Sequence, residues 1–258
     1  MNDRLRDRRI IVFGSATGIG AATVKRLARE GARVCAADIN IDRAQQVARD
    51  AGGDCFAVHC DISDEASVNA ATEAAVARFG GLDGAHINAA DLRVIMEDSD
   101  ALAIDLAVFD RTVAVNLRGH LLCTRAVVPH LIRNAASALV YTSSGSAHGG
   151  EPTRPCYAMT KAGVNALMRH VAARWGREGL TANVLAPGFT VTGEMRTQME
   201  ANAEEATKWA DYFMSRTPHT RLGESEDHAA VVALLLSTDG RWINGTVIDV
   251  NGGSLMRA

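Results

Sequence analysis

The stretch Ile10-Ile11-Val12-Phe13-Gly14-Ser15-Ala16-Thr17-Gly18-Ile19-Gly20 decides the fold. Its first four residues form a short apolar run that favours a buried strand, and apolar residues at helical spacing begin at Ile19. Glycines between the two allow the backbone to turn tightly and to approach a pyrophosphate, which then lies on the positive end of the helix. Taken alone this G-x3-G-x-G spacing is a weak signal, because glycine-rich turns between strand and helix are common.

Strand-like and helical stretches alternate along the rest of the 258 residues. Strands are expected at 10–13, 33–38, 56–59, 86–88, 139–142, 182–185 and 246–250, and helices at 19–31, 41–51, 63–79, 109–132, 157–175 and 224–236. Ser63 is expected to cap the third helix. This order predicts an α/β fold of one domain, residues 1–258, with a doubly wound, parallel, seven-stranded Rossmann-like sheet and helices on both faces.

The stretch 189–222 is too long for an ordinary loop and contains a helical patch at 194–213. Excursions of this length are usually lids or binding elements, so we expect a lid-like substrate segment here. Two interpretations of its large apolar side chains stay open: they pack the lid onto the body, or some of them contact an apolar, ring-shaped substrate. These side chains are Met195, Met199, Trp209, Phe213 and Met214.

Composition excludes several classes of protein. A net charge of −3 gives no basic field for nucleic acid, and no stretch approaches the roughly 18 apolar residues of a membrane span. The charged start of the chain differs from a signal peptide. No Cys/His set has metal-ligand spacing, so no metal site is expected. The five scattered cysteines are expected to be buried free thiols of a cytoplasmic protein: Cys35, Cys55, Cys60, Cys123 and Cys156.

A carboxylate closes the second expected strand, 18 residues after Gly20. There Asp38 can accept hydrogen bonds from the adenosine ribose hydroxyls of NAD, although it can also cap the next turn; with the glycine loop in place we favour the ribose. Two roles also stay open for Asp61: it can cap the following helix or contact the adenine. Neither the glycine loop nor Ile39 is basic, and Arg43 is the nearest cation, so NAD is expected in preference to NADP.

Tyr157 and Lys161 are four residues apart at the start of an expected helix, so both project from one face. A nearby ammonium favours the phenolate and lowers the pKa of the tyrosine from about 10, and such a phenol can give a proton to the alkoxide that hydride transfer leaves on a ketone. Ser144 ends a strand 13 residues before Tyr157, and one loop can bring it to the substrate oxygen. Ser143 and Ser146 are alternatives for that role.

These motifs resemble those of the short-chain dehydrogenase/reductase family, in its short single-domain branch, over nearly the whole chain. The motifs that carry the resemblance are Gly14, Gly18 and Gly20; Asp61-Ile62; Asn116; Ser144; Tyr157 and Lys161; Pro187-Gly188 with Thr192; Asn244-Gly245; and Asp249-Val250-Asn251-Gly252-Gly253.

The resemblance implies a sheet order of 3-2-1-4-5-6-7, a homotetramer, and a role for each catalytic residue. Tyr157 would be the general acid/base and Lys161 would bind the nicotinamide ribose. Ser144 would polarise the carbonyl, and Asn116 would hold a water near Lys161. Contacts to NAD are expected from Gly14, Ser15, Thr17, Gly18, Ile19, Gly20, Asp38, Ile39, Asp61, Ile62, Asn88, Tyr157, Lys161, Pro187, Gly188, Thr190 and Thr192, and contacts to substrate from Ser144, Ser146 and Tyr157.

The chain departs from the family pattern after the fourth strand, where NNAG reads Ile87-Asn88-Ala89-Ala90. The lost Asn supports the sheet and the adjoining adenosine contact, so weaker cofactor binding is expected. Phe13 replaces the usual Thr, and Thr190 stands where Ile or Val is common. None of these positions belongs to the catalytic set.

The sequence therefore predicts an NAD-dependent oxidoreductase acting on a secondary alcohol or ketone, with a small molecule as its partner. A catalytically silent NAD-binding protein is one alternative, opposed by the retained Ser144, Tyr157 and Lys161. A 3-oxoacyl carrier-protein reductase is another, opposed by Asp38 because those relatives mostly use NADPH. A zinc-dependent alcohol dehydrogenase is opposed by the absence of metal-ligand spacing.

Overall fold

Seven parallel strands form the central sheet of the computed structural model, which describes residues 3–201 and 203–257, without the side chains of 198–206. The strand order is β3-β2-β1-β4-β5-β6-β9, so the predicted order is confirmed, with β9 as the seventh strand of the sheet. The strands are β1 (Arg9–Phe13), β2 (Arg33–Asp38), β3 (Cys55–His59), β4 (Gly84–Ile87), β5 (Ser137–Thr142), β6 (Leu180–Pro187) and β9 (Val247–Val250).

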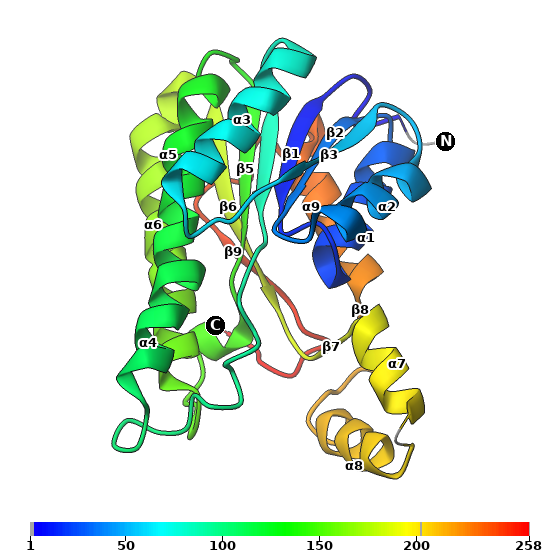
Figure 1. The fold of residues 1–258 in the computed structure, drawn as a ribbon, viewed down its shortest axis with the longest axis vertical. Coiled ribbons are helices and arrows are strands. Elements are labelled where there is room, and N and C mark those ends of the chain that lie inside the picture. Colours follow the sequence, from blue (N-terminus) through cyan, green and yellow to red (C-terminus); the bar gives the residue numbers. More distant parts are fainter. Residues whose placement is uncertain (1–2, 202, 258) are drawn as a thin grey trace.

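Helices cover both faces of the sheet (Figure 1). One face carries α1 (Gly18–Arg29), α2 (Ile41–Ala51) and α9 (Ser225–Leu236), and the other carries α3 (Glu65–Phe79), α4 (Leu106–Val113), α5 (His120–Leu131) and α6 (Pro155–Trp175). Each face has its own apolar core, because the strands are buried on both sides and their side chains alternate between the two.

Three expectations about local structure need correction. The helix expected over 109–132 is not uniform, because a π-helical turn, Ala114–Gly119, separates α4 from α5. Asp64 and not Ser63 caps α3, since its carboxylate accepts a hydrogen bond from the amide of Ala66 at 3.0 Å. Cys55 is only half-buried, whereas the other four thiols are buried as expected.

The 189–222 excursion leaves and rejoins the body through a small second sheet. Strands β7 (Thr190–Val191) and β8 (Gly223–Glu224) pair in parallel, and α7 (Gly193–Ala201) and α8 (Ala203–Met214) lie between them in sequence. In Figure 1 these two helices extend away from the carboxyl ends of the strands. Phe213 stacks on Phe189, with ring centroids 3.6 Å apart, so part of the excursion packs on its own base. The side chain of Met199 lies outside the described residues.

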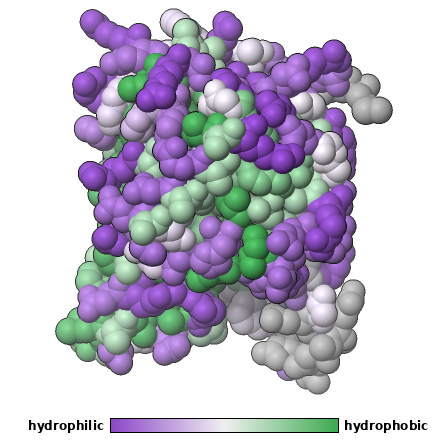
Figure 2. Space-filling model, turned by 45° about the horizontal axis from the view of Figure 1, so that its top comes forward, coloured by the Kyte–Doolittle hydropathy of each residue, from purple (hydrophilic) through white to green (hydrophobic). Residues whose placement is uncertain are grey.

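The surface is mostly hydrophilic, with hydrophobic side chains in small areas near the middle and the lower left of the view in Figure 2. Over the described residues, no helix is long and apolar enough to cross a membrane.

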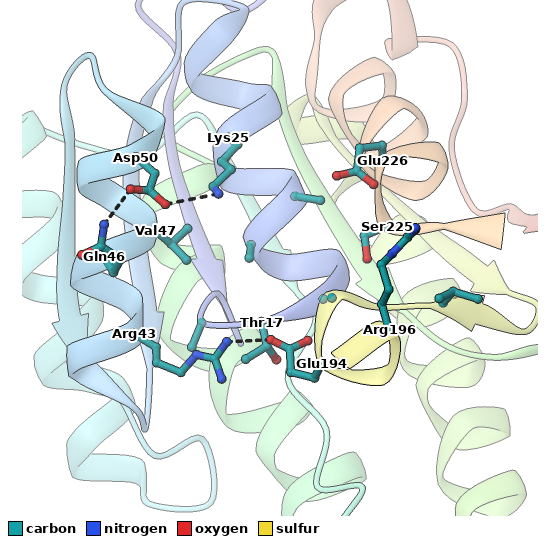
Figure 3. Close-up of a pocket in the computed structure, with 16 residues that line it drawn as sticks. Thr17, Lys25, Arg43, Gln46, Val47, Asp50, Glu194, Arg196, Ser225 and Glu226 are labelled. Atoms are coloured by element: carbon teal, nitrogen blue, oxygen red, sulfur yellow. Dashed lines mark hydrogen bonds and ion pairs between the residues drawn. The ribbon is translucent and has the colours of Figure 1, made fainter. Parts of the chain in front are cut away.

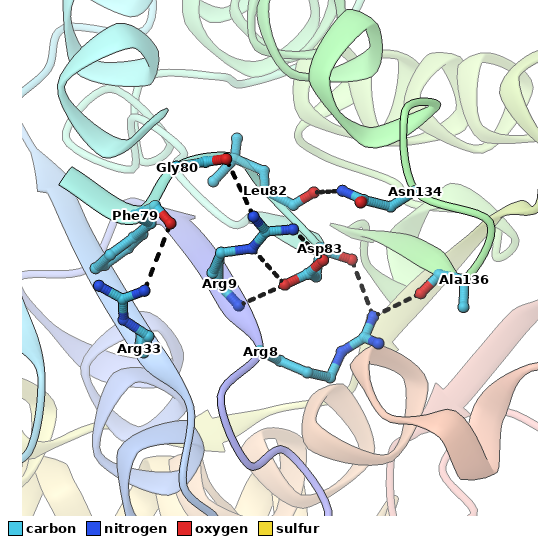
Figure 4. Close-up of polar contacts among 9 residues, drawn as sticks. All are labelled: Arg8, Arg9, Arg33, Phe79, Gly80, Leu82, Asp83, Asn134 and Ala136. Carbon is cyan, nitrogen blue, oxygen red and sulfur yellow. Dashed lines mark hydrogen bonds and ion pairs between the residues drawn. The ribbon is translucent and has the colours of Figure 1, made fainter. Parts of the chain in front are cut away.

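The amino-terminal ends of β1, β4 and β5 are held by two arginines (Figure 4). The side chain of Arg9 donates two hydrogen bonds to the carboxylate of Asp83, at 2.7 and 2.8 Å, and its backbone amide donates a third at 3.0 Å. Arg8 donates to the carbonyl oxygens of Asp83 and Ala136. Burial alone would raise the pKa of Asp83, but the hydrogen bonds from Arg9 outweigh it and lower that pKa below its ordinary value.

We expect Asp83→Asn to lower the free energy of unfolding by about 1–3 kcal/mol at pH 7, because hydrogen bonds to a charged, partly buried group are lost. Asp54→Asn is the control, since Asp54 pairs with Arg33 and Arg78 in a more exposed position and should cost less than about 1 kcal/mol. Urea denaturation measures both. A lowered folded pKa gives stability that is lost on acidification, so the Asp83→Asn deficit should shrink below about pH 4. A deficit that is the same at all pH values would contradict this interpretation.

Candidate active site

Two glycines bring the first turn against the fourth strand. Gly14 has φ +79°, and a Cβ on it would lie 2.5 Å from Cα of Ala89. A Cβ on Gly20 would lie 1.8 Å from the carbonyl oxygen of Gly14. Neither position accepts a side chain without a backbone shift, so the glycine spacing in the sequence reflects close packing of the loop. The loop leads directly into the first turn of α1, whose free backbone amides can bind a pyrophosphate.

Asp38 ties the end of β2 to this loop. Its carboxylate accepts hydrogen bonds from the amides of Ala16 and Asn40, both at 2.9 Å. The turn-capping alternative is therefore observed, and a carboxylate has lone pairs left for ribose hydroxyls. Asp61 accepts from the amide and the hydroxyl of Ser63 at 2.8 and 2.7 Å, which are contacts of a turn. The adenine contact of Asp61 stays a prediction.

A chain of hydrogen bonds joins β4 and β5 to the glycine loop. Asn88 donates to the carbonyl oxygen of Gly14 at 2.9 Å, and Thr142 donates to the side-chain oxygen of Asn88 at 3.0 Å. Because the Thr142 hydroxyl proton is used there, Nε2 of His86 must donate to that hydroxyl, at 2.8 Å. Burial lowers the pKa of His86 to about 3, which keeps the ring neutral.

Sequence reasoning missed His86 and Thr142 as parts of the site. The only signal was a histidine inside an apolar strand, next to the position where the family pattern loses its Asn. The contact of Asn88 with the loop shows that the retained Asn positions the glycine loop directly.

Thr142 also holds the lysine of the expected catalytic set. Nζ of Lys161 donates to the carbonyl oxygen of Thr142 at 2.9 Å and lies 5.6 Å from the ring centroid of Tyr157. Burial lowers the pKa of Lys161 to about 8, because the charged form loses water. Ser143, an alternative to Ser144, is buried and donates to the carbonyl oxygen of Lys161, so it is not available for substrate.

Tyr157 and Ser144 meet as expected, but the pKa of the phenol moves against the prediction. Burial raises the pKa of Tyr157 above 10, and the hydrogen bond with Ser144 only partly offsets this. The ammonium of Lys161 is directed at a carbonyl oxygen and does not reverse the effect of burial. Tyr157 is therefore protonated at neutral pH, which suits it to donate a proton to an alkoxide.

Asp98 positions the start of α6, although nothing in its local sequence indicated this. Its carboxylate is buried and accepts the amides of Tyr157, at 2.8 Å, and Cys156, at 3.2 Å. Arg154, the residue immediately before α6, has φ +64°, a left-handed conformation that is uncommon for residues other than glycine. Its amide donates to the carbonyl oxygen of Asp98 at 2.9 Å. Asp98, 59 positions earlier in the chain, thus holds the backbone of Tyr157 in place.

Asn116 lies in the π-helical turn. Its side-chain oxygen accepts the amide of Asp91 at 2.8 Å, and its buried amide nitrogen has no partner within the described residues. Asp91 pairs with Arg93 and Arg111, and their hydrogen bonds hold the pKa of this carboxyl well below its usual range. A free buried donor suits the water expected from the resemblance.

The other expected cofactor contacts gather around the end of β6. The amide of Gly188 donates to the carbonyl oxygen of Val250 at 3.1 Å, and Pro187 ends the strand. Thr190 donates to the carbonyl oxygen of Gly188 at 3.0 Å and contacts Nε2 of His228 at 2.7 Å. A methyl group of Thr192 lies 3.2 Å from where Gly18 would carry a Cβ, so the start of the excursion touches the glycine loop.

For four of the residues expected to contact the cofactor, the structure shows no contact that indicates such a role. Ser15 is buried with its hydroxyl unpartnered among the described residues, Ile39 is 55% exposed, and Ile62 packs against Gly119. Ile19 packs on the core of the α1 face.

A cleft of about 400 Å³ runs between the glycine loop, α2 and α7 (Figure 3). Thr17 and Gly18 line it on one side, and Glu194 lines it on the other. Arg43 reaches across from α2, with Nη2 2.8 Å from a carboxylate oxygen of Glu194.

A second charged pair lies on the loop between Ser144 and Tyr157. The hydroxyl of Ser146 donates to Glu151 at 2.9 Å, and Arg154 donates to the other oxygen of Glu151 at 2.9 Å. The contact of Ser146 with substrate stays a prediction. Both charges act on the phenol, Arg154 lowering the pKa of Tyr157 and Glu151 raising it, and both effects are smaller than that of burial.

This fold and site define a nicotinamide-dependent oxidoreductase that moves a hydride between its cofactor and an alcohol or ketone. A family model described as enoyl-(acyl carrier protein) reductase matches residues 14–254. Together with the relatives below, this match shows that the chain belongs to the short-chain dehydrogenase/reductase family. Among the described residues, no cluster of ligating side chains could hold a metal ion.

The relatives align with nearly the whole length of the chain. Levodione reductase of Leifsonia aquatica is 33% identical over 97% of this chain and 95% of its own. A 2,5-dichloro-2,5-cyclohexadiene-1,4-diol dehydrogenase of Sphingobium indicum is 33% identical, covering 96% and 97%. The structure of a 3-ketoacyl-(acyl-carrier-protein) reductase from Brucella melitensis complexed with NADH has a TM-score of 0.86, with 30% identity over 97% of this chain and 99% of its own.

We expect Tyr157→Phe to lower kcat by at least about 10²–10⁴-fold, because it removes the proton donor and keeps the ring. Fluorescence titration with NADH should show little change in Kd. Tyr212→Phe, on the exposed face of α8, is the control and should keep its activity. Near-normal turnover of Tyr157→Phe would show that another group transfers the proton.

Proposed function

We propose that this protein is an NAD-dependent dehydrogenase/reductase of a secondary alcohol or ketone carried on a ring. The observation that carries the proposal is the half-buried Tyr157, which lies near both the hydroxyl of Ser144 and the amine of Lys161. Hydrogen bonds through Thr142 and Asn88 join this pair to a glycine loop that accepts no side chains at Gly14 and Gly20.

Each residue has a defined task in this mechanism. When bound, the nicotinamide supplies or accepts the hydride. Ser144 donates a hydrogen bond to the substrate oxygen, and Tyr157 gives its proton to that oxygen during reduction or takes one during oxidation. Lys161, held by the carbonyl oxygen of Thr142, would bind the nicotinamide ribose and would favour the phenolate when the proton leaves. Asn116 holds a water near Lys161, for which its unpartnered amide nitrogen is suited.

We assign the expected cofactor residues to three parts of the dinucleotide. The loop Gly14, Ser15, Thr17, Gly18, Ile19 and Gly20 holds the pyrophosphate; Asp38, Ile39, Asp61, Ile62 and Asn88 surround the adenosine; and Pro187, Gly188, Thr190 and Thr192 orient the nicotinamide. The carboxylate of Asp38 beside the loop supports NAD over NADP, because it repels a 2′-phosphate. The NADH bound by the Brucella relative is in line with this choice.

The Glu151–Arg154 pair supports a substrate with a second, uncharged oxygen. The pair offers one donor and one acceptor close to the phenol and carries no net charge, which suits a hydroxyl or a carbonyl and disfavours a carboxylate. The relative named for a cyclohexadiene-1,4-diol acts on a ring with two such oxygens. A carrier-bound 3-oxoacyl chain is the second candidate, favoured by the Brucella reductase.

The proposal extends to the organisation of the whole protein. Residues 1–258 would act as one catalytic domain, with 189–222 as a lid over the substrate, and the protein would work in the cytoplasm. The homotetramer is supported by an apolar groove between α5 and α6, lined by Leu121, Val128, Leu167 and Trp175. Such a groove on an outer helix face suits a second copy of the same chain.

We expect kcat/KM with NAD to exceed that with NADP by at least about a hundredfold, because a like-charge contact in a cleft costs several kcal/mol. Asp38→Ser combined with Ile39→Arg should narrow or reverse the preference. Steady-state kinetics with both cofactors measure it. Equal efficiency in the unmodified enzyme would remove Asp38 from the cofactor site.

Among six-membered ring alcohols, kcat/KM for a 1,4-diol should exceed that for a 4-hydroxycarboxylic acid by at least about tenfold, because Arg154 is already paired with Glu151 and leaves no unmatched positive charge for the carboxylate. Glu151→Gln leaves the charge of Arg154 unmatched and should favour the acid. Formation of NADH from each alcohol is the measurement. A panel in which only 3-hydroxyacyl thioesters react would instead support the carrier-bound substrate.

A further inference from the structure

The Arg43–Glu194 ion pair joins two parts of the chain that are 151 residues apart. Arg43 belongs to the first turn of α2, and Glu194 to the first turn of α7, at the start of the 189–222 excursion. Figure 3 shows the two side chains meeting across the cleft, in front of Thr17 of the glycine loop. The guanidinium therefore lies at the glycine loop, and a residue of the excursion holds it there.

Short contacts link Arg43 to the adenosine end of the site. The amide of Arg43 donates to the side chain of Asn40 at 3.2 Å, and the amide of Asn40 donates to Asp38 at 2.9 Å. These contacts hold the backbone of Arg43 about one turn after Asp38, the carboxylate proposed to bind the ribose. Of the other described cations in this cleft, Lys25 pairs with Asp50 and Arg196 pairs with Glu224.

We propose that Glu194 is a cofactor-specificity residue, which disfavours a 2′-phosphorylated dinucleotide by holding the guanidinium of Arg43. This inference rests on the proposed preference for NAD. With Glu194 in place, a 2′-phosphate arriving beside Asp38 meets two carboxylates and an arginine that already has a partner. Without the charge of Glu194, Arg43 can turn to the phosphate, the bidentate partner that guanidinium prefers.

The charge of the two cofactors explains why Glu194 would add to the preference set by Asp38. NAD carries no charge at the 2′ position, so its binding depends little on whether Arg43 is free. The 2′-phosphate carries up to two negative charges, so its binding changes with every charge nearby. The pair is exposed to solvent, 54% for Arg43 and 35% for Glu194, so the effect is moderate.

The test is a set of variants of the full-length protein, titrated with NADPH and NADH by fluorescence without substrate. We expect Glu194→Gln to lower the Kd for NADPH by about three- to tenfold, and to change the Kd for NADH by less. The double variant Arg43→Gln/Glu194→Gln should lose the gain, because no freed guanidinium is left. Glu224→Gln is the matched control, since it breaks another ion pair of the same segment, the one between Arg196 and Glu224.

Three results would overturn the proposal: an unchanged ratio of the two Kd values in Glu194→Gln, a gain that persists in the double variant, or an equal gain in Glu224→Gln. The first would show that Arg43 does not reach the phosphate, and the other two that any loosening of the segment admits NADPH. Failure of the proposed function is distinguishable, since it would appear as equal binding of NADH and NADPH by the unmodified protein.

Discussion

Thr142, at the carboxyl end of β5, joins the two halves of the site through its two oxygen atoms. Its carbonyl oxygen accepts Nζ of Lys161, and its hydroxyl accepts from His86 and donates to Asn88, which holds the carbonyl oxygen of Gly14. One buried residue therefore positions both the glycine loop and Lys161, the lysine proposed to be catalytic. Because the carbonyl oxygen of Gly14 can only accept, Asn88 must donate to it through its amide nitrogen, and the directions of the hydrogen bonds from Thr142 and His86 follow.

This network changes the meaning of the altered fourth-strand motif. The sequence at Ile87-Asn88-Ala89-Ala90 loses one Asn of the family pattern, which predicted weaker support of the adenosine site. In the structure a neutral His86, one residue earlier, supplies a buried donor to the same sheet edge. Its other ring nitrogen has no partner among the described residues, so the compensation leaves one buried polar atom unsatisfied.

Two of the cations around the site are each paired with a carboxylate, so neither gives the site an unmatched positive charge. Arg43 with Glu194, and Arg154 with Glu151, each pair a cation with a carboxylate next to the proposed site. A neutral pair can bind hydroxyl groups and still disfavour anions, and this is the chemistry expected of an enzyme for NAD and an uncharged ring alcohol. Both carboxylates come from segments outside the motifs that carry the family resemblance.

The sequence by itself determined the alternation of strands and helices, the strand order through the resemblance, and the residues Ser144, Tyr157 and Lys161. These depend on local patterns, namely apolar periodicity, glycines that a tight turn requires, and a four-residue helical spacing. The tertiary structure decided what depends on distant partners. Asp98 fixes the amide of Tyr157 from 59 residues away, Glu194 reaches Arg43 across 151, and burial raises the pKa of the tyrosine that spacing alone predicted to fall. Contacts between distant residues and the loss of water on burial are properties of the folded chain, and no local pattern encodes them.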